Sequence, residues 1–301
     1  MKTTRRSFIQ HSAVLLAGTA LFSKAAFAAS KSPEIVGLQL YSVRDDMKKD
    51  PVGTLTQLAK MGYKNVEHAN YIDRKFYGFT AKEFKKVLDD LDLKMPSGHT
   101  VMGKEHWNAA KKEFTDAWKY TVDDAAVMGQ HYVISPWIDE SVRKSYDSLM
   151  QIMEAFNKSG ELCQKSGMKF GYHNHWFEFS ESLNGEKIFD IMMKKLDFGL
   201  VAMQLDMGNM YIGGAKAVDV LNQYPGKFEL LHVKDEIPVN TEEKYESAIL
   251  GKGIIPVKEV LDICRKTGGT KVYIIEQESY QGKAPLVCMK ENFEIMKGWG
   301  Y

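Results

Sequence analysis

Four apolar segments in the second half of the sequence end in, or run directly into, a side chain that can bind a metal ion. The segments are 169–173, 201–205, 229–233 and 271–276, and the side chains are His173, Asp206, His232 and Glu276. An isolated charge at the end of a buried strand is costly unless it is paired or bound to a metal. The position of these groups is therefore the first indication of chemistry in the chain.

Two imidazoles and two carboxylates from successive strands suit one divalent cation, such as Mn²⁺, Co²⁺, Zn²⁺ or Mg²⁺. We predict that His173, Asp206, His232 and Glu276 bind such an ion. The alternative is that the four are separate structural groups that satisfy loops and helix N-termini.

Short apolar runs alternate with longer amphipathic ones from residue 36 onward, and this pattern predicts the elements that position those groups. The strand-like runs are 36–41, 65–68, 94–100, 132–135, 169–173, 201–205, 229–233 and 271–276. Helical periodicity appears between them, for example over 51–61, 81–91, 113–128 and 142–165. Alternating strands and helices imply right-handed βαβ units and a parallel sheet.

Eight such units in the space of one domain predict the α/β class and a single (β/α)8 TIM barrel over residues 29–301. A doubly wound open sheet is the rival, but no GxGxxG follows the first strand, where Gly37 to Tyr41 reads GLQLY. In a barrel, the chemistry lies at the carboxyl ends of the strands, where the four candidate ligands fall.

The composition excludes several classes of protein. The 301 residues are 44% hydrophobic and 26% charged with a formal net charge of +1, so global disorder, a nucleic-acid partner and a polybasic membrane binder are all disfavoured. Three cysteines (Cys163, Cys264 and Cys288) are too few and too scattered for a disulfide framework.

The first 28 residues have the pattern of a secretory signal. Arg5 and Arg6 precede an apolar run from Ala13 to Phe22 and an A-x-A site that ends at Ala28, and the run is shorter than the ~20 residues of a membrane span. The arginine pair followed by Ser-Phe-Ile is typical of a twin-arginine signal, with a general secretory signal as the alternative. We expect a periplasmic protein with no lipid anchor. Loss of residues 1–28 removes four of the 40 basic residues and none of the 39 acidic ones, leaving 36 and a net charge of −3.

The chain resembles the xylose isomerase-like TIM barrels, often called sugar phosphate isomerases/epimerases. The resemblance rests on the eight repeats and on the segments 172–175 (YHNH), 205–208 (LDMG), 232–235 (HVKD) and 275–276 (IE). It implies a metal held by one residue from each of strands five to eight, usually Glu, Asp, His and Glu. Asp206, His232 and Glu276 match that pattern. His173 stands where relatives often have Glu, and Asn209 stands where they often have His.

The resemblance also implies chemistry through a metal-stabilised enediolate. Family epimerases use two opposed glutamates, and His173 cannot serve as the second carboxylate base. The departure disfavours two-base epimerisation and fits chemistry with one base better, as in relatives that act on 3-keto-glycosides and eliminate the aglycone. The resemblance implies a metal-dependent sugar isomerase/epimerase, with a 3-keto-glycoside lyase or hydrolase of the same barrel family as the alternative. In the implied mechanism, Glu276 or His175 removes the proton, and Lys234 neutralises charge or protonates an oxygen. The alternative for Lys234 is a surface side chain paired with Asp235 or Glu236.

The implied substrate is a small carbohydrate, and several further residues are candidates to contact it. They are Glu67, His99, Trp107, Trp137, Asn174 and Trp176, of which the tryptophans could stack on a pyranose face. A non-catalytic exported sugar-binding protein is a second hypothesis, favoured by the missing strand-five glutamate. A metal-dependent endonuclease of the same barrel type is disfavoured, because an exported chain with a net charge of −3 seldom meets DNA. The sequence leaves an oligomer open.

Overall fold

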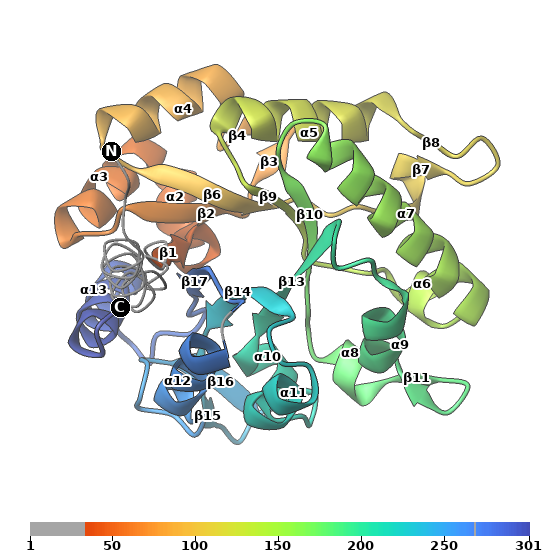
Figure 1. Cartoon of the computed structure of the whole chain (residues 1–301). Coiled ribbons are helices and arrows are strands. Elements are labelled where there is room, and N and C mark those ends of the chain that lie inside the picture. The colour runs from red at the N-terminus through yellow and green to blue at the C-terminus, as the bar shows by residue number, and fades with distance from the viewer. Residues whose placement is uncertain (1–33, 268) are drawn as a thin grey trace, which may run out of the picture. The chain divides into compact units, whose positions relative to one another are not determined.

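A computed structural model describes residues 34–267 and 269–301, and within them eight parallel strands close into a barrel (Figure 1). In chain order they are β1 (Ile35–Gln39), β2 (Asn65–His68), β6 (Lys94–His99), β9 (Tyr132–Ser135), β10 (Lys169–His173), β13 (Val201–Asp206), β14 (Phe228–Val233) and β17 (Val272–Ile275). Each strand pairs with the next around the ring, and β17 pairs with β1. The predicted (β/α)8 barrel is confirmed.

Helices follow the strands along the chain and surround them (Figure 1). They are α3 (Pro51–Met61), α4 (Ala81–Asp90), α5 (Asp116–Met128), α7 (Tyr146–Gln164), α9 (Ile188–Lys195), α11 (Ala217–Gln223), α12 (Val257–Thr267) and α13 (Pro285–Gly298). Sequence signals explain several ends: Asp50 caps α3 with Pro51 in its first turn, and Thr80 and Glu83 form a capping box on α4. Gly62 and Gly129 end α3 and α5 in the left-handed conformation.

Two of the predicted helices are corrected by the structure. The predicted helix over 142–165 is two helices, α6 (Glu140–Arg143) and α7, because the Ser145 side chain accepts the Ser148 N–H and starts a new helix. The predicted helix over 113–128 begins at Asp116, because Glu113 pairs with Asn108 in a hairpin.

Short elements lie in the connections. The helical ones are η1 (Leu40–Val43), α2 (Arg44–Lys49), η2 (Lys104–His106), α8 (Phe177–Ser180) and α10 (Met207–Ile212). The extended ones form small antiparallel sheets: β3 (Tyr71–Ile72), β4 (Lys75–Phe76) and β5 (Phe79–Thr80); β7 (Trp107–Asn108) and β8 (Glu113–Phe114); β11 (Ser182–Leu183) and β12 (Glu186–Lys187); β15 (Asp235–Pro238) and β16 (Tyr245–Ala248).

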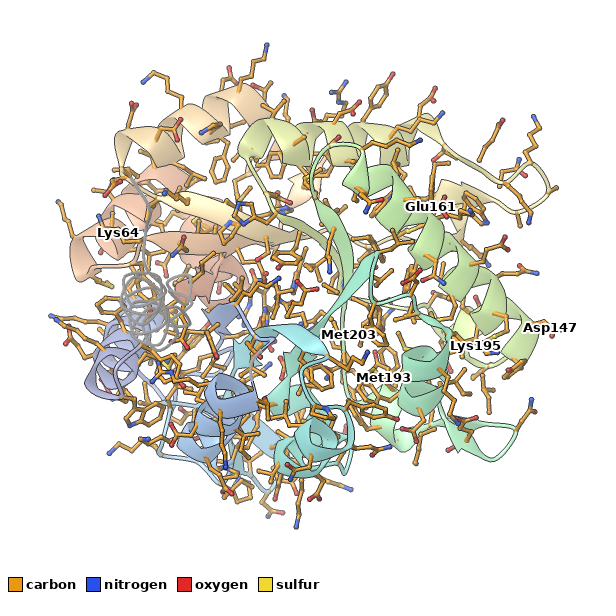
Figure 2. All side chains as sticks on the ribbon, viewed as in Figure 1. Lys64, Asp147, Glu161, Met193, Lys195 and Met203 are labelled. Atoms are coloured by element: carbon orange, nitrogen blue, oxygen red, sulfur yellow. The ribbon has the colours of Figure 1, made fainter. Side chains whose placement is uncertain are left out.

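The apolar core has two parts. The larger part lies between strands and helices and includes Met203 on β13 and Met193 on α9, both labelled in Figure 2. The smaller part contains residues from four strands: Tyr132 and Ile134 on β9, Ala202 on β13, Leu230 on β14, and Val272 and Ile274 on β17. The two residues from β9, like the two from β17, are spaced two apart and so share one face of their strand. Gly171 leaves room for it, since a Cβ there would lie 2.3 Å from Ile134 Cδ1.

Alternate residues of a strand point to the same side. On the face of the strands that carries the smaller core, the side chains change from apolar to polar toward the carboxyl ends. Leu230 is followed on its face by His232 and then Lys234, and Ile274 is followed by Glu276. The register places Asp206 opposite His232 and Gln39 opposite Glu67. The strand pattern therefore brings the candidate ligands to one end of the barrel.

A partly exposed ionic cluster joins β9, β10 and β14 to the residue before β17, near the amino ends of these strands. The Glu229 carboxylate accepts hydrogen bonds from Tyr132 Oη at 3.0 Å, from Lys271 Nζ at 2.9 Å and from Lys169 Nζ. Burial raises the pKa of Glu229, but its hydrogen bonds from Lys169 and Lys271 outweigh burial and hold the pKa below its ordinary value. The ionised form therefore stabilises the barrel.

We expect Glu229→Gln to lower the free energy of unfolding by about 1–3 kcal/mol, because it weakens charge-assisted hydrogen bonds. A carboxyl group whose pKa falls on folding stabilises the folded state at pH values above its unfolded pKa. The loss of unfolding free energy in Glu229→Gln should therefore be complete above about pH 5 and become smaller in more acidic solution. Urea titrations at several pH values measure it. Glu161→Gln, at an exposed position on α7 labelled in Figure 2, is the matched control. Equal losses in both variants would contradict the assignment.

The predicted signal peptide, residues 1–28, lies outside the described residues and stays a prediction. Among the described residues, no helix is both long enough and apolar enough to span a membrane.

Candidate metal centre and active site

The four predicted metal ligands lie together at the carboxyl ends of β10, β13, β14 and β17. One ligand atom from each of His173, Asp206, His232 and Glu276 lies within 4.8 Å of the others, and all four residues are buried. The Asp206 Oδ2 atom lies 3.8 Å from His232 Nδ1 and 3.9 Å from His173 Nε2. His232 Nδ1 lies 3.0 Å from Glu276 Oε2.

Asp206 presents an unpartnered oxygen to this cluster. Its Oδ1 accepts the Asn209 N–H at 2.7 Å and so caps α10, whereas Oδ2 is buried and has no hydrogen-bond partner. Burial raises the pKa of Asp206 to about 7. A buried carboxylate oxygen without a partner is unfavourable, and a cation among these four groups would satisfy it.

Each histidine of the cluster uses its second ring nitrogen to bond a fixed partner. His232 Nε2 lies 2.6 Å from Glu67 Oε1, and His173 Nδ1 lies 3.0 Å from Gln204 Oε1. These contacts leave His232 Nδ1 and His173 Nε2 directed at the cluster. Metal-binding histidines commonly have such outer partners, which fix the ring orientation. Burial alone would lower the pKa of His232, but Glu276 and Glu67 outweigh it and raise the pKa to about 10.

Glu67 is the centre of a buried network behind the ligands. Its two oxygens accept from Gln39 Nε2 and Gln204 Nε2, each at 2.8 Å, and from the Ser97 hydroxyl. His99 Nε2 lies 3.0 Å from Oε1. Burial raises the pKa of Glu67, but His99 and His232 outweigh burial and hold it well below its ordinary value. The ionised Glu67 carboxylate therefore accepts a hydrogen bond from His232 and orients the His232 ring.

We expect Glu67→Gln to weaken divalent-metal binding about 10- to 100-fold. The amide NH₂ group of the new side chain would face side chains that are themselves hydrogen-bond donors. Titration of the metal-free protein with Mn²⁺ or Zn²⁺ measures the change. Glu229→Gln, which alters a half-buried glutamate near the opposite ends of the strands, should leave the metal affinity unchanged. An unaltered affinity in Glu67→Gln would contradict the positioning role.

Lys234 lies within the cluster and not on the surface, so the alternative of a surface pair with Asp235 or Glu236 is wrong. Its side chain is 3% exposed; Nζ donates to Glu278 Oε1 and lies 3.5 Å from Glu276 Oε2 and 3.8 Å from Asp206 Oδ2. Burial lowers the pKa of Lys234, but Glu278, Asp206 and Glu276 outweigh it and raise the pKa well above its ordinary value. Lys234 is a buried cation among three carboxylates.

A cavity of about 970 Å³ opens over this cluster. Of the residues predicted to act on or contact substrate, it is lined by His99, Trp137, His175 and Glu276, and the predicted ligand His173 lines it as well. The backbone N–H of His175 donates to the buried Glu178 carboxylate at 2.9 Å, while its Nδ1 has no partner. Burial and Lys234 lower the pKa of His175 to about 3, so its imidazole is neutral.

Other predicted contact residues lie elsewhere. Asn174 is buried and bonds the backbone of Asp206 in both directions, at 3.0 and 3.1 Å, so it positions a ligand. Trp107 packs on Phe114 in the β7–β8 hairpin, and Trp176 packs edge-on against Trp137. Neither Trp107 nor Trp176 is among the residues that line the cavity, and Glu67 lies behind the ligands.

Two site residues were missed from the sequence. Gln204 bonds His173, His99 and Glu67, and Glu278 lines the cavity and bonds Lys234. Gln204 lies two residues before Asp206 on the same face of β13, so strand periodicity could have found it. Glu278 lies beyond the end of β17, where that periodicity no longer applies.

Comparisons with known proteins agree with this barrel. Residues 55–298 match the Xylose isomerase-like TIM barrel family, and the chain belongs to that family. An inosose dehydratase of Clostridium perfringens is 24% identical over 200 residues, which is 63% of this chain and 65% of that relative's length.

Two solved structures share the fold. A sugar phosphate isomerase/epimerase from Parabacteroides distasonis has a TM-score of 0.74 at 24% identity over 91% of this chain and 97% of its own. The IolI protein, solved with a bound zinc atom, has a TM-score of 0.66 at 12% identity over 88% of this chain and 97% of its own.

Proposed function

We propose that the chain is a divalent-metal-dependent enzyme that removes a proton next to the carbonyl of a polyhydroxylated ketone and then eliminates a neighbouring oxygen substituent. The observation that carries the proposal is the buried His173–Asp206–His232–Glu276 set, of which His173 and Glu276 line a cavity large enough for such a ketone. The similarity to inosose dehydratases supports a dehydratase-type reaction.

The residues present fit a divalent ion. Asp206 Oδ2 has no partner, and both imidazoles of the set are held by outer acceptors in the orientation a ligand needs. Two nitrogen and two carboxylate ligands are compatible with Zn²⁺, Co²⁺ or Mn²⁺ and less typical of Mg²⁺. When bound, such an ion supplies Lewis-acid polarisation of a carbonyl oxygen.

The chain itself supplies the groups that move protons. Glu276 and His175 line the cavity, so either can accept the proton from the carbon next to the carbonyl. The group that accepts this proton can return it to the leaving oxygen, which then departs as water. Glu276 is the preferred base, because its carboxylate lines the cavity and Lys234 Nζ, 3.5 Å from its Oε2, orients it. Lys234 is not among the residues that line the cavity, so its role is to balance the charges of Glu276, Glu278 and Asp206.

Elimination is favoured over two-base epimerisation by the distribution of acids around the cavity. Epimerisation by two opposed carboxylates needs a second carboxylate that faces Glu276 across the substrate. His173 occupies the strand-five position, and Glu67 is buried and fully engaged behind the ligands. The lining acids other than Glu276 are Glu278, two residues further along the same connection, and Asp73 at the mouth.

The test is turnover of an inosose by protein loaded separately with Mn²⁺, Co²⁺, Zn²⁺ or Mg²⁺, with product analysed by mass spectrometry. We expect loss of one water from the ketone in at least one metal-loaded form. An inverted product with no loss of water would favour an epimerase. Tight binding of several ketoses without turnover in any form would favour a non-catalytic sugar-binding protein.

A further inference from the structure

The Lys234 ammonium shares two carboxylates with the predicted metal site. Its Nζ atom lies 3.5 Å from Glu276 Oε2 and 3.8 Å from Asp206 Oδ2. The same two oxygens face the metal-site imidazole of His232, whose Nδ1 atom lies 3.0 Å from the first and 3.8 Å from the second. Nζ also donates to Glu278 Oε1, and Glu278 is not one of the four predicted ligands. The ammonium therefore has two carboxylates in common with the metal site and one of its own.

The stem of Lys234 is enclosed by Gly208 and Glu236. A Cβ atom at Gly208 would lie 2.8 and 2.9 Å from Lys234 Cγ and Cδ and 2.6 Å from Glu236 Oε1. Glu236 is 1% exposed, and its Oε1 atom has no hydrogen-bond partner. Burial raises the pKa of Glu236 to about 8, so near neutral pH it adds an oxygen and not a full charge. Two buried carboxyl oxygens without a partner, Asp206 Oδ2 and Glu236 Oε1, thus lie near one ammonium.

The charges around Nζ leave room for one divalent ion and not for two. Asp206, Glu276 and Glu278 each place a carboxylate oxygen within 4 Å of Nζ. One divalent ion and one ammonium supply as many positive charges as these three carboxylates supply negative ones. A second divalent ion beside the ammonium would leave uncompensated positive charge in a buried site, which is costly.

The place of Nζ is that of a second cation in a two-ion centre. The ions of such centres lie about 3.5–4 Å apart. A carboxylate has two oxygens, so it can contact both cations. A lysine ammonium is a compact point charge on a flexible stem, and it can fill such a position without the ligand geometry that a metal ion demands.

We propose that Lys234 is a built-in substitute for a second metal ion. Its ammonium keeps the centre at one divalent ion per chain. Removal of the ammonium opens a second cation site, whose ligands are Asp206, Glu236, Glu276 and Glu278. This inference rests on the proposed function only for the ion that the four-residue set binds.

The number of ions decides which chemistry the centre supports. One ion is enough to polarise a carbonyl, whereas two ions are used to hold the attacking and leaving oxygens of a phosphoryl displacement. Lys234 is therefore a specificity-determining residue that restricts the site to one-ion chemistry. Glu278 lines the cavity and its side chain is 38% exposed, so an ion from solvent can reach the position that Nζ leaves.

The test is the number of Mn²⁺ ions bound per chain after chelation and reloading. Equilibrium dialysis with elemental analysis counts the ions, and electron paramagnetic resonance detects pairs of them. We expect one ion per chain in wild type and two in Lys234→Ala. The spectrum of the alanine variant should show spin coupling, because two ions that share carboxylates lie only a few Å apart.

Three matched variants separate a second site from non-specific uptake. Lys234→Met fills the same space with an apolar side chain and should bind one ion. Lys234→Ala/Glu278→Gln loses one of the charged ligands and should bind the second ion at least about tenfold more weakly than Lys234→Ala. Lys258→Ala, at an exposed lysine on α12, should bind one ion as wild type does.

Several results would overturn the inference. They are two ions of comparable affinity in wild type, two ions in Lys234→Met, or only one in folded Lys234→Ala. An alanine variant that stays unfolded in excess Mn²⁺ also counts against it, because a divalent ion should replace the lost ammonium among the carboxylates.

The ion count needs no turnover, so the two proposals fail separately. A wild-type protein that binds no ion, or that binds one and turns over no ketone, would overturn the proposed function. One ion in wild type and no more in Lys234→Ala would overturn the substitute role of Lys234 alone.

Discussion

The Asp206→Asn protein is expected to lose its divalent ion and at least about a thousandfold of its turnover, which corresponds to ~4 kcal/mol of transition-state stabilisation. The amide keeps the size of the side chain and an oxygen that can accept the Asn209 N–H, so the cap of α10 survives. It removes the negative charge at Oδ2, the buried oxygen that has no partner in the cluster. Metal analysis of the purified protein and steady-state kinetics measure the two losses.

Asp219→Asn is the matched control, because Asp219 is an exposed aspartate in the first turn of α11. It should keep both metal and turnover. Full metal content and wild-type turnover in the Asp206 variant would show that the four-residue cluster is structural.

The Lys234→Met protein is expected to lose turnover about 100-fold or more while it keeps its metal. Lys234 is the buried ammonium that lies within 3.5 to 3.8 Å of the oxygens of Glu276 and Asp206 and donates to Glu278. Without it, the carboxylates repel one another, and the metal-free protein should lose about 3 kcal/mol of stability. A bound cation offsets that repulsion, so added metal should restore much of the lost stability.

Measurements of turnover, metal content and melting temperature distinguish the role of Lys234 from that of Asp206. Lys258→Met, at an exposed lysine on α12 that pairs with Asp262 at 2.8 Å, should match wild type in turnover, metal content and melting temperature. Wild-type turnover in the Lys234 variant would remove Lys234 from the active site. Loss of metal from it would contradict the charge-balancing role.

The barrel could be predicted because its strands are buried on both faces and flanked by turn signals. The predicted limits for β2, β9 and β10 agree with the structure, and those of other strands differ by a residue or two. The break between α6 and α7 was missed, because the apolar periodicity runs through Ser145 although this residue caps a new helix. Local capping there outweighed the longer pattern.

The grouping of the four candidate ligands followed from the same reasoning, since parallel strands bring their carboxyl ends to one edge. The roles of Glu67 and Lys234 did not follow. Glu67 reaches His232 across 165 positions of sequence, and Lys234 is buried by carboxylates from two other strands. Such contacts depend on how the barrel closes.

The most direct measurement of the central claim is proton exchange at the carbon next to the carbonyl of an inosose in D₂O, followed by NMR with metal-loaded and chelator-treated protein. We expect deuterium incorporation, with or without loss of water, in the metal-loaded protein and none after chelation or in Asp206→Asn. Incorporation that is equal with and without metal would contradict the metal-dependent mechanism. No incorporation and no loss of water in any metal-loaded form would contradict proton abstraction itself.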